Sequence, residues 1–348
     1  MRRLAPLSIL LLLLASVGCV VTRASGLPES LSRADFWQLS AGASEPDGYF
    51  RSPNLTSNEV QFQYVIPELI RNVKPGNVYL GVGPEQNFTY IAALKPSMAI
   101  IFDIRRGNLL LQLMYKAIFE LASDRAEFVS LLFSRSRPPG LGPDRTVTDL
   151  MAAYGELTGS RVEFEKNSKA IRGRLRRVDG LPLSENDVNA IQQIYETFYT
   201  DGFRVRYSPT YDELMTATDE AGLHRSYLAT ESSFAFMKDL EQRNLVVPVV
   251  GDFGGPKAIR SVAAYLRAHN ATVGAFYLSN VEQYLESKTV TFCRNVQSLP
   301  LDRSSTFIRS SSRGFGGYGF GYGRGFVSSL GNMLNETRVC QDNPVTSR

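Results

Sequence analysis

The chain has 348 residues, of which 43% are hydrophobic, 21% are charged and 11% are aromatic. This composition is typical of a globular protein with one large domain or two small ones, and it excludes a largely disordered, fibrous or polytopic membrane protein. The formal net charge is +4. Because part of this small surplus lies in the first residues, the charge does not indicate a nucleic-acid partner.

Residues 1–24 have the layout of an export signal. Arg2 and Arg3 precede an apolar run at 7–14, and small residues follow the run. The run is shorter than the ~20 apolar residues that span a bilayer. We therefore expect an exported protein of the periplasm or cell envelope that is not an integral membrane protein after processing.

Two interpretations of the processing site remain open. Residues 16–19, Ser-Val-Gly-Cys, resemble a bacterial lipoprotein box, in which a lipid on Cys19 would be the membrane attachment. Residues 22–24, Thr-Arg-Ala, fit an ordinary signal peptidase instead. Cleavage at the first site removes two arginines and lowers the net charge from +4 to +2, and cleavage at the second removes a third and lowers it to +1. The mature chain is nearly neutral in both cases.

The cysteines agree with export. If Cys19 is removed or lipidated, Cys293 and Cys340 remain as a pair. We predict a disulfide between them, which would close a loop of about 47 residues and stabilise the fold by about 3–4 kcal/mol in the chain-entropy model. The alternative is a pair of buried free thiols.

The first part of the mature chain predicts the opening of an α/β sheet. Residues 25–55 form an N-terminal extension that includes a linker rich in Ser, Gly, Pro and Asp. Within 56–124 we expect a helix opened by a capping box at 56–59 and running to 72, a strand at 78–83, a helix at 85–94, a strand at 97–103 and a helix at 108–122. This order is typical of the first half of a doubly wound, mostly parallel Rossmann-like sheet.

The remaining chain predicts an insertion and then the second half of the sheet. Residues 125–235 are expected to form a mostly helical insertion or lid. Residues 236–300 resume the sheet pattern with a strand at 245–252, a helix at 257–269 and a strand at 272–278. The C-terminal segment, 301–348, contains a stretch rich in Gly, Tyr, Phe and Arg at 310–326, for which a flexible surface loop or a cell-envelope contact is favoured over single-stranded nucleic-acid binding.

A glycine turn and a carboxylate follow two successive strands. Gly81 and Gly83 end the first strand, and Asp103 ends the next strand, 20 residues after Gly83. Glycines let the backbone approach a ligand, and a carboxylate at this spacing can bind both hydroxyls of a ribose. The pattern predicts a site for a nucleoside-type small molecule.

The segment 78–103 resembles the S-adenosylmethionine site of class I Rossmann-like methyltransferases, and its Gly-Val-Gly-Pro-Glu-Gln-Asn-Phe motif is similar to that of uncharacterised bacterial exported methyltransferase-like proteins. The resemblance implies S-adenosylmethionine or a related nucleoside as cofactor and methyl transfer to an unknown acceptor. It also implies a sheet of strand order 3-2-1-4-5 with an antiparallel partner beyond it. The implied cofactor-binding residues are Gly81, Gly83, Glu85 and Asp103.

Two positions depart from the family pattern. Tyr79 stands where the family usually has an acidic residue, and Glu85 replaces the third glycine. A carboxylate at Glu85 would either repel the carboxylate of S-adenosylmethionine or contact its ammonium group. Since S-adenosylmethionine is made and held in the cytosol, an alternative is a non-catalytic exported or lipid-anchored binding or structural protein that retains the fold.

The candidate catalytic and substrate-binding residues follow the later strands. The resemblance places methyl-transfer chemistry after the fourth strand, expected here at 251–256, where Asp252 would orient or deprotonate an acceptor or, alternatively, cap the next helix. Asn280 and Glu282 follow the expected fifth strand and are candidates for substrate binding, with helix capping as the alternative.

Other classes of site lack their motifs. His224 and His269 are the only histidines, and neither stands in a pattern with cysteines or carboxylates, so we expect no metal site. The sequence has neither a Gly-x-Ser-x-Gly nor a phosphate-loop Gly-Lys-Ser/Thr motif. The expected partner is therefore a small-molecule ligand, with no nucleic acid.

Overall fold

The computed structural model describes residues 26–205, 208–312 and 326–342. The predicted export signal with Cys19, and most of the Gly/aromatic-rich stretch, lie outside these residues. The described chain forms a six-stranded sheet of order β3-β2-β1-β4-β5-β6, in which β6 is antiparallel to β5 and the other pairs are parallel. The strands are β1 Val78–Val82, β2 Ala99–Asp103, β3 Val246–Val250, β4 Val273–Ser279, β5 Leu301–Ser312 and β6 Phe326–Asn332. The predicted α/β class with a mostly parallel, Rossmann-like sheet is confirmed.

The central strands are buried on both faces, which is why they read as uninterrupted apolar runs. Every residue of β2 and β3 is buried, and β1 is buried except at its last residue. The register of β1 on β2 pairs Gly81 with Ile101 and Val82 with Phe102. Gly83 N then donates to Phe102 O at 3.0 Å, so the glycine turn begins beside the end of β2.

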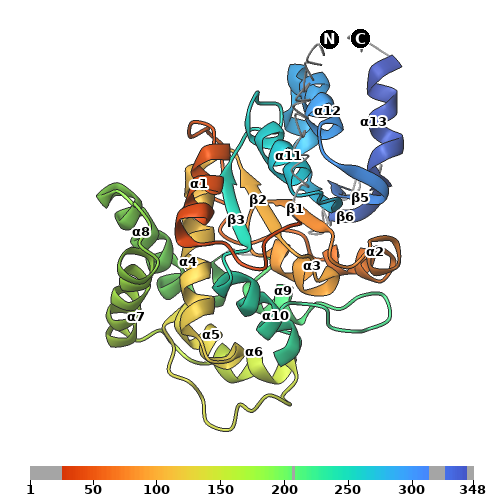
Figure 1. The fold of residues 1–348 in the computed structure, drawn as a ribbon. Helices are drawn as coiled ribbons and strands as arrows, with labels where there is room; N and C mark the ends of the chain where they lie inside the picture. The colour runs from red at the N-terminus through yellow and green to blue at the C-terminus, as the bar shows by residue number, and fades with distance from the viewer. Residues whose placement is uncertain (1–25, 206–207, 313–325, 343–348) are drawn as a thin grey trace, which may run out of the picture.

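Helices cover the two faces of the sheet. Helices α5 to α10 gather at one end of the molecule and α11 to α13 at the opposite end (Figure 1). The helices are α1 Arg33–Ala43, α2 Ile66–Asn72, α3 Gln86–Leu94, α4 Arg106–Leu121, α5 Arg125–Phe133, α6 Val147–Gly155, α7 Arg161–Gly173, α8 Glu185–Asp201, α9 Tyr211–Thr216, α10 Glu231–Gln242, α11 Ala258–Ala268, α12 Thr289–Gln297 and α13 Met333–Asp342.

The N-terminal extension runs along the edge of β3. Helix α1 packs on β3 and α11, and Ser40 Oγ donates to Pro248 O at 2.5 Å. Just after the helix, Val250 N donates to Ser44 Oγ at 3.0 Å and Glu45 N donates to Val250 O at 2.8 Å. The extension is therefore hydrogen-bonded to the outer side of the sheet.

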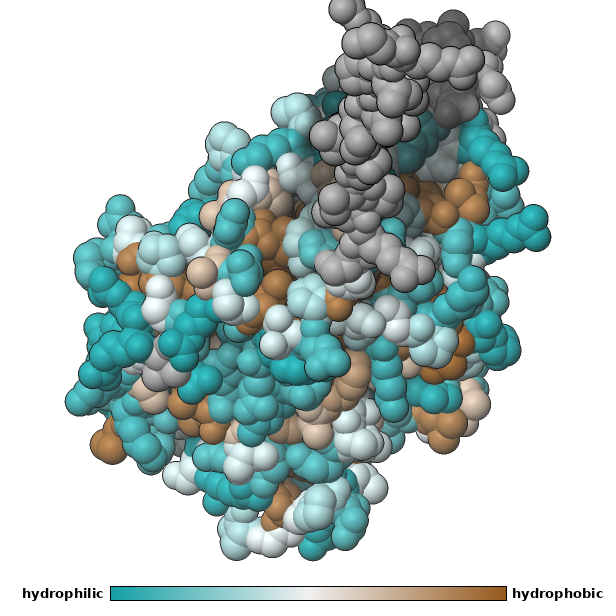
Figure 2. All heavy atoms as spheres, viewed as in Figure 1, coloured by the Kyte–Doolittle hydropathy of each residue, from teal (hydrophilic) through white to brown (hydrophobic). Residues whose placement is uncertain are grey.

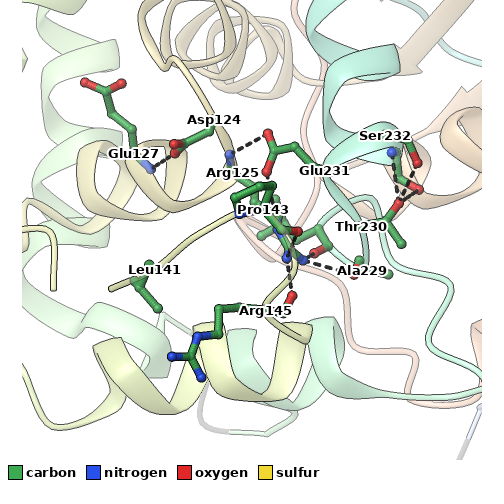
Figure 3. A network of polar contacts seen from close by, with 12 residues as sticks. Asp124, Arg125, Glu127, Leu141, Pro143, Arg145, Ala229, Thr230, Glu231 and Ser232 are labelled. Atoms are coloured by element: carbon green, nitrogen blue, oxygen red, sulfur yellow. Dashed lines mark hydrogen bonds and ion pairs between the residues drawn. The ribbon is translucent and has the colours of Figure 1, made fainter. Parts of the chain in front are cut away.

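The segment 125–235 contains α5 to α9 and the beginning of α10, so its expected boundary at 235 falls inside a helix. Buried Arg125 joins its separate loops (Figure 3). The guanidinium donates to the backbone carbonyls of Pro143, Arg145, Leu228 and Ala229. Its Nε lies 3.4 Å from Glu231 Oε2. Burial lowers the pKa of Arg125, and the ring of carbonyls compensates the buried charge.

The prediction that a helix begins at residue 56 is wrong. Residues 56–61 are irregular, a 3₁₀ turn occupies Phe62–Val65, and α2 begins at Ile66 with Pro67 in its first turn. Proline is favoured there because its missing N–H has no intrahelical partner in any case. The Glu59 side chain does not close a capping box, because it turns into the interior of the protein.

The numbering of two later strands differs from expectation, although the order 3-2-1-4-5 with an antiparallel partner beyond it is the expected one. The strand expected to be the fourth is β3, at the sheet edge beside β2, and the strand expected to be the fifth is β4, beside β1. The fifth strand and its antiparallel partner come from the C-terminal segment. Within the described residues, no helix is both long and apolar enough to cross a membrane. The face in Figure 2 is mostly hydrophilic, with hydrophobic residues in small groups.

Candidate functional site

A cavity of about 220 Å³ lies at the carboxyl ends of the parallel strands. Its lining includes Gly83 after β1, Asp103 at the end of β2, Asp252 after β3 and Ser279 at the end of β4. Strand β1 has β2 on one side and β4 on the other. The strand order therefore reverses at this point, and open α/β sheets bind their ligands at such a switch point.

The N-terminal extension supplies one wall of this cavity. Tyr49, Phe50 and Asn54 line it together with residues 56–58. The Phe50 ring meets the Tyr284 ring edge to face, with centroids 5.3 Å apart. The sequence analysis described most of this segment as a linker and missed its contribution to the site. The two neighbouring aromatic residues, Tyr49 and Phe50, were the signal that could have indicated it.

Of the two glycines, only Gly83 lines the cavity. Its φ is +79°, and a Cβ built on it would have no heavy atom of the described chain within 4 Å, so a ligand has room to approach the backbone. A Cβ on Gly81 would instead lie 1.8 Å from Asn87 Oδ1. Gly81 is thus required by packing inside the protein.

Asn87, which the sequence analysis missed, holds the glycine turn. Its Nδ2 donates to Val82 O at 2.9 Å and to Pro84 O at 2.7 Å, and its Oδ1 accepts from Tyr79 Oη at 2.9 Å. Burial raises the pKa of Tyr79 well above its ordinary value, so the phenol keeps the proton that it donates. The departure at Tyr79 is therefore a structural contact with the turn.

Glu85 lies behind the turn, outside the lining of the cavity. The side chain is fully buried, and its Oε1 accepts from Ser57 N at 3.1 Å. It fastens the wall-forming segment 56–58 to the beginning of α3. In this arrangement Glu85 supports the site from beneath, and its carboxylate is directed to protein groups.

Asp103 lines the cavity but is already engaged by Arg105. Arg105 Nε lies 2.9 Å from Oδ1, Arg105 Nη2 lies 2.8 Å from Oδ2, and Arg105 N also donates to Oδ1 at 2.9 Å. A carboxylate has about four lone-pair positions. The three hydrogen bonds from Arg105 occupy both positions of Oδ1 and one of Oδ2, so about one lone-pair position on Oδ2 is left for a ligand.

Asp252 lines the cavity from the turn after β3, the third strand of the chain. Its Oδ1 accepts from Gly254 N at 2.9 Å, and its Oδ2 pairs with Lys288 Nζ at 2.5 Å. The sequence analysis placed Asp252 after the fourth strand of the sheet, and this is wrong, because Asp252 follows the third strand, β3, and the fourth strand is β4. The cap of α11 is provided by Glu45, whose Oε1 accepts from Lys257 N at 2.7 Å and Ala258 N at 2.9 Å.

Of the two substrate-binding candidates after β4, Asn280 and Glu282, only Asn280 lines the cavity. Asn280 lines the cavity, and its side chain makes a long contact of 3.5 Å with Tyr284 Oη. Glu282 points to another part of the protein, where it pairs with Arg309 at 2.5 Å. Asn280 is placed to contact a ligand, whereas Glu282 joins β5 to the turn after β4.

A buried carboxylate lies beneath the cavity floor. Glu59 is 1% exposed and accepts hydrogen bonds from Gln86 Nε2 at 2.8 Å, Tyr277 Oη at 2.9 Å, Ser279 Oγ at 2.6 Å and Ser310 Oγ. Burial and the neighbouring Glu59 raise the pKa of Tyr277 well above its ordinary value. Sequence reasoning assigned Glu59 to a helix cap, so this network was missed.

The polar groups of the cavity favour a ligand without phosphates. The described residues that line it include two carboxylates, those of Asp103 and Asp252, and no lysine, arginine or histidine. Thr56 is 2% exposed, lines the cavity, and has no hydrogen-bond partner for Oγ1 within the described chain. That hydroxyl is available to a ligand. No group of three or more metal-binding side chains occurs in the described ranges.

The two cysteines of the predicted disulfide, Cys293 and Cys340, belong to two helices that pack against each other. Cys293 is buried on α12, which packs against α13, the helix that carries Cys340. The Cys293 sulfur lies 4.0 Å from Thr337 O, about one turn before Cys340. The Cys340 side chain lies outside the described residues, so the disulfide stays a prediction.

Comparison with known proteins identifies the family. No curated protein matches the chain. A family described as a domain of unknown function, DUF7790, matches residues 54–336, which is well over half of the chain and includes every strand and every wall of the cavity except Tyr49 and Phe50. The protein therefore belongs to the family of the domain of unknown function DUF7790.

Proposed function

We propose that the cavity binds a nucleoside-type small molecule, S-adenosylmethionine or a relative of it, and that the protein is an exported methyltransferase-like protein of unknown acceptor. The observation that carries this proposal is that Gly83 and Asp103, from two successive strands, line one cavity at the switch point. The strand order β3-β2-β1-β4-β5, with antiparallel β6 beyond it, supports the same assignment.

The residues present fit such a ligand in three respects. Gly83 leaves open space for close approach to the backbone. Asp103 retains room on Oδ2 for one ribose hydroxyl, and Arg105 holds the carboxylate in place. The orphaned Thr56 hydroxyl offers a further hydrogen bond to the ligand. S-adenosylmethionine, when bound, supplies an electrophilic methyl group.

Asp252 and Asn280 would act toward the acceptor. Both line the cavity, from the turns after β3 and β4. The Asn280 amide can donate to or accept from an acceptor group. Since Asp252 accepts a hydrogen bond from Gly254 N and is paired with Lys288 at 2.5 Å, its carboxylate is held in a fixed position, and its role would be to orient the acceptor.

A second function is favoured by the same pairing. Both cavity carboxylates are neutralised by a partner, Asp103 by Arg105 and Asp252 by Lys288. Both carboxylates are held in fixed positions by these cations, which is an arrangement suited to binding a ligand. The alternative proposal is therefore a non-catalytic exported or lipid-anchored binding protein with the same ligand class.

Titration calorimetry of the mature protein with S-adenosylmethionine and S-adenosylhomocysteine tests the site. We expect binding by the unaltered protein and by Asp144→Ala, a control that removes an exposed carboxylate from a loop of the helical segment. Asp103→Ala should lose binding. Absence of heat with either ligand at millimolar concentration would overturn the proposal.

A second measurement separates the enzyme from the binding protein. The protein is incubated with S-adenosylmethionine and an extract of its own cell envelope, and the formation of S-adenosylhomocysteine is followed. Formation that is lost in Asn280→Ala supports methyl transfer. Binding in the calorimeter without any formation supports the binding protein.

A further inference from the structure

The carboxylate of Glu59 differs from the others at the cavity because it has no cationic partner. In the described part of the chain, the four hydrogen bonds to its carboxylate come from neutral donors, and no arginine, lysine or histidine pairs with it. Asp103 and Asp252, by contrast, each have a cation within 2.8 Å. Buried charges in proteins are usually paired with an opposite charge.

Two of the residues that donate hydrogen bonds to Glu59 also line the cavity, so they connect the buried carboxylate to it. Tyr277 and Ser279 line the cavity, and both hydroxyls donate to Oε1. A hydroxyl has a single proton to donate. Because that proton is committed to Glu59, each hydroxyl can only accept a hydrogen bond from a ligand.

The backbone at Ser279 keeps its hydroxyl in this position. Ser279 ends β4 with a φ of +50°, a left-handed conformation that is uncommon for residues other than glycine. The turn places its hydroxyl at the carboxyl edge of the sheet, 2.6 Å from Glu59. Such a conformation persists when the surrounding contacts fix it, and it is found frequently at functional sites.

The mouth of the cavity adds aromatic faces. Tyr49 is 85% exposed and Tyr284 is 44% exposed, and both line the cavity with Phe50. Large aromatic side chains exposed next to a cavity are suited to contact with an apolar or cationic ligand, because the face of an aromatic ring attracts cations. The mouth and the floor therefore favour the same kind of group.

We propose that Tyr277 and Ser279, backed by Glu59, form a subsite for an organic ammonium group, with the aromatic residues Tyr49, Phe50 and Tyr284 contacting the apolar part of the same ligand. This names a primary amine as the ligand class on the β4 side of the cavity. It rests on the proposed function in placing a second ligand in the same cavity, and it concerns binding of the amine as its ammonium ion without any methyl transfer to the nitrogen. For binding it depends only on the cavity, so it can be tested without S-adenosylmethionine.

The test compares benzylamine with benzyl alcohol, which has a similar shape but carries no charge at neutral pH. Each is titrated into the ¹⁵N-labelled mature protein, and the amide shifts are followed by NMR. We expect benzylamine to bind at least tenfold more tightly than benzyl alcohol, with the largest shifts at residues 56–59 and 277–281. Equal affinities, or shifts centred elsewhere, would overturn the proposal.

Variants then assign the effect to Glu59. Glu59→Gln should weaken benzylamine at least tenfold and leave benzyl alcohol unchanged. Glu286→Gln, which removes the same charge from an exposed site near the cavity, should leave both unchanged. If Glu59→Gln does not fold, Tyr277→Phe replaces it, because it removes one of the two accepting hydroxyls and keeps the carboxylate. Unchanged benzylamine binding in Tyr277→Phe would contradict the subsite.

The two proposals fail in different measurements. Loss of nucleoside binding in the calorimeter leaves the amine titration interpretable, because benzylamine is bound in the absence of any cofactor. Tight nucleoside binding together with equal affinity for benzylamine and benzyl alcohol would retain the proposed function and reject the ammonium subsite.

Discussion

Asp103 and Arg105 form a two-pronged ion pair at the carboxyl end of β2, with Nε–Oδ1 and Nη2–Oδ2 distances of 2.9 and 2.8 Å. The side chains are 9% and 12% exposed, respectively. The third nitrogen of the guanidinium, Nη1, donates to the carbonyls of Ser52 and Pro53. One arginine therefore connects the candidate ribose-binding carboxylate to the segment that walls the cavity.

Arg105→Ala should destabilise the protein by about 3 kcal/mol, because it leaves Asp103 as a largely buried charge without its cation. Chemical denaturation measures this loss. In Asp103→Asn/Arg105→Ala the loss should be smaller than the sum of the two single losses, since residues in direct contact are coupled. Additive losses would show that the ion pair contributes nothing.

Alanine at the two glycines should have different effects. Gly81→Ala should cost about 3 kcal/mol of stability, because its methyl group overlaps Asn87 inside the protein. Gly83→Ala should cost only about 1–2 kcal/mol, the price of a left-handed conformation, but should weaken nucleoside binding because its methyl group enters the cavity. Denaturation and calorimetry on both variants check this difference. Equal stability losses would contradict it.

Glu241 should make the protein less stable as pH rises. Its burial raises the pKa from 4.5 to about 8, with Lys116 opposing and Glu120 adding to the effect. Between these values the native state holds a proton that the unfolded chain has released, so the free energy of unfolding falls with a slope of up to about 1.4 kcal/mol per pH unit. The contribution is complete below pH 4.5 and is lost as pH rises toward 8.

Glu241→Gln removes this titration. Urea denaturation at pH 5, 6, 7 and 8 should show the variant gaining stability relative to the unaltered protein as pH rises. The exposed replacement Glu286→Gln serves as the control and should follow the unaltered protein. Parallel profiles for Glu241→Gln and the unaltered protein would contradict a raised pKa.

The processed protein should have a defined mass. Material recovered from cells that export it should begin with a lipidated Cys19 or at Ser25, and its mass should increase by about 2 Da on reduction if Cys293 and Cys340 form a disulfide. Intact mass spectrometry with and without reductant measures both. Retention of residues 1–24 would reject export, and an unchanged mass on reduction would reject the disulfide.

The local sequence pattern was sufficient to predict those parts of the structure that depend on residues close together in the sequence. Strands β1 and β2 are buried on both faces, so their apolar runs and the carboxylate at Asp103 could be predicted. The pattern at 56–59 was misleading, because Glu59 bonds to Tyr277 and Ser310, more than 200 residues away. No local signal reports such a contact.

Strand order and the remaining site residues also depend on distant partners. A parallel strand reads alike at the edge and at the centre of a sheet, so 246–250 could not be placed beside β2 from its sequence. Strand β5, which is rich in serine, has too few apolar residues to give the pattern of a buried strand. Asn87 was missed because an asparagine in a helix carries no signal that it holds a turn.

The hydrogen bonds between the N-terminal extension and β3 have a consequence for solubility. Parallel strand β3 is an outer strand, and an open strand edge can pair with another molecule. Pro248 has no N–H on this side, and Ser40 Oγ, Ser44 Oγ and Glu45 N bond to the remaining outward groups of Pro248 and Val250. A fragment that starts at residue 54 would expose this edge, and we expect it to aggregate through β3 even though it retains every strand of the sheet.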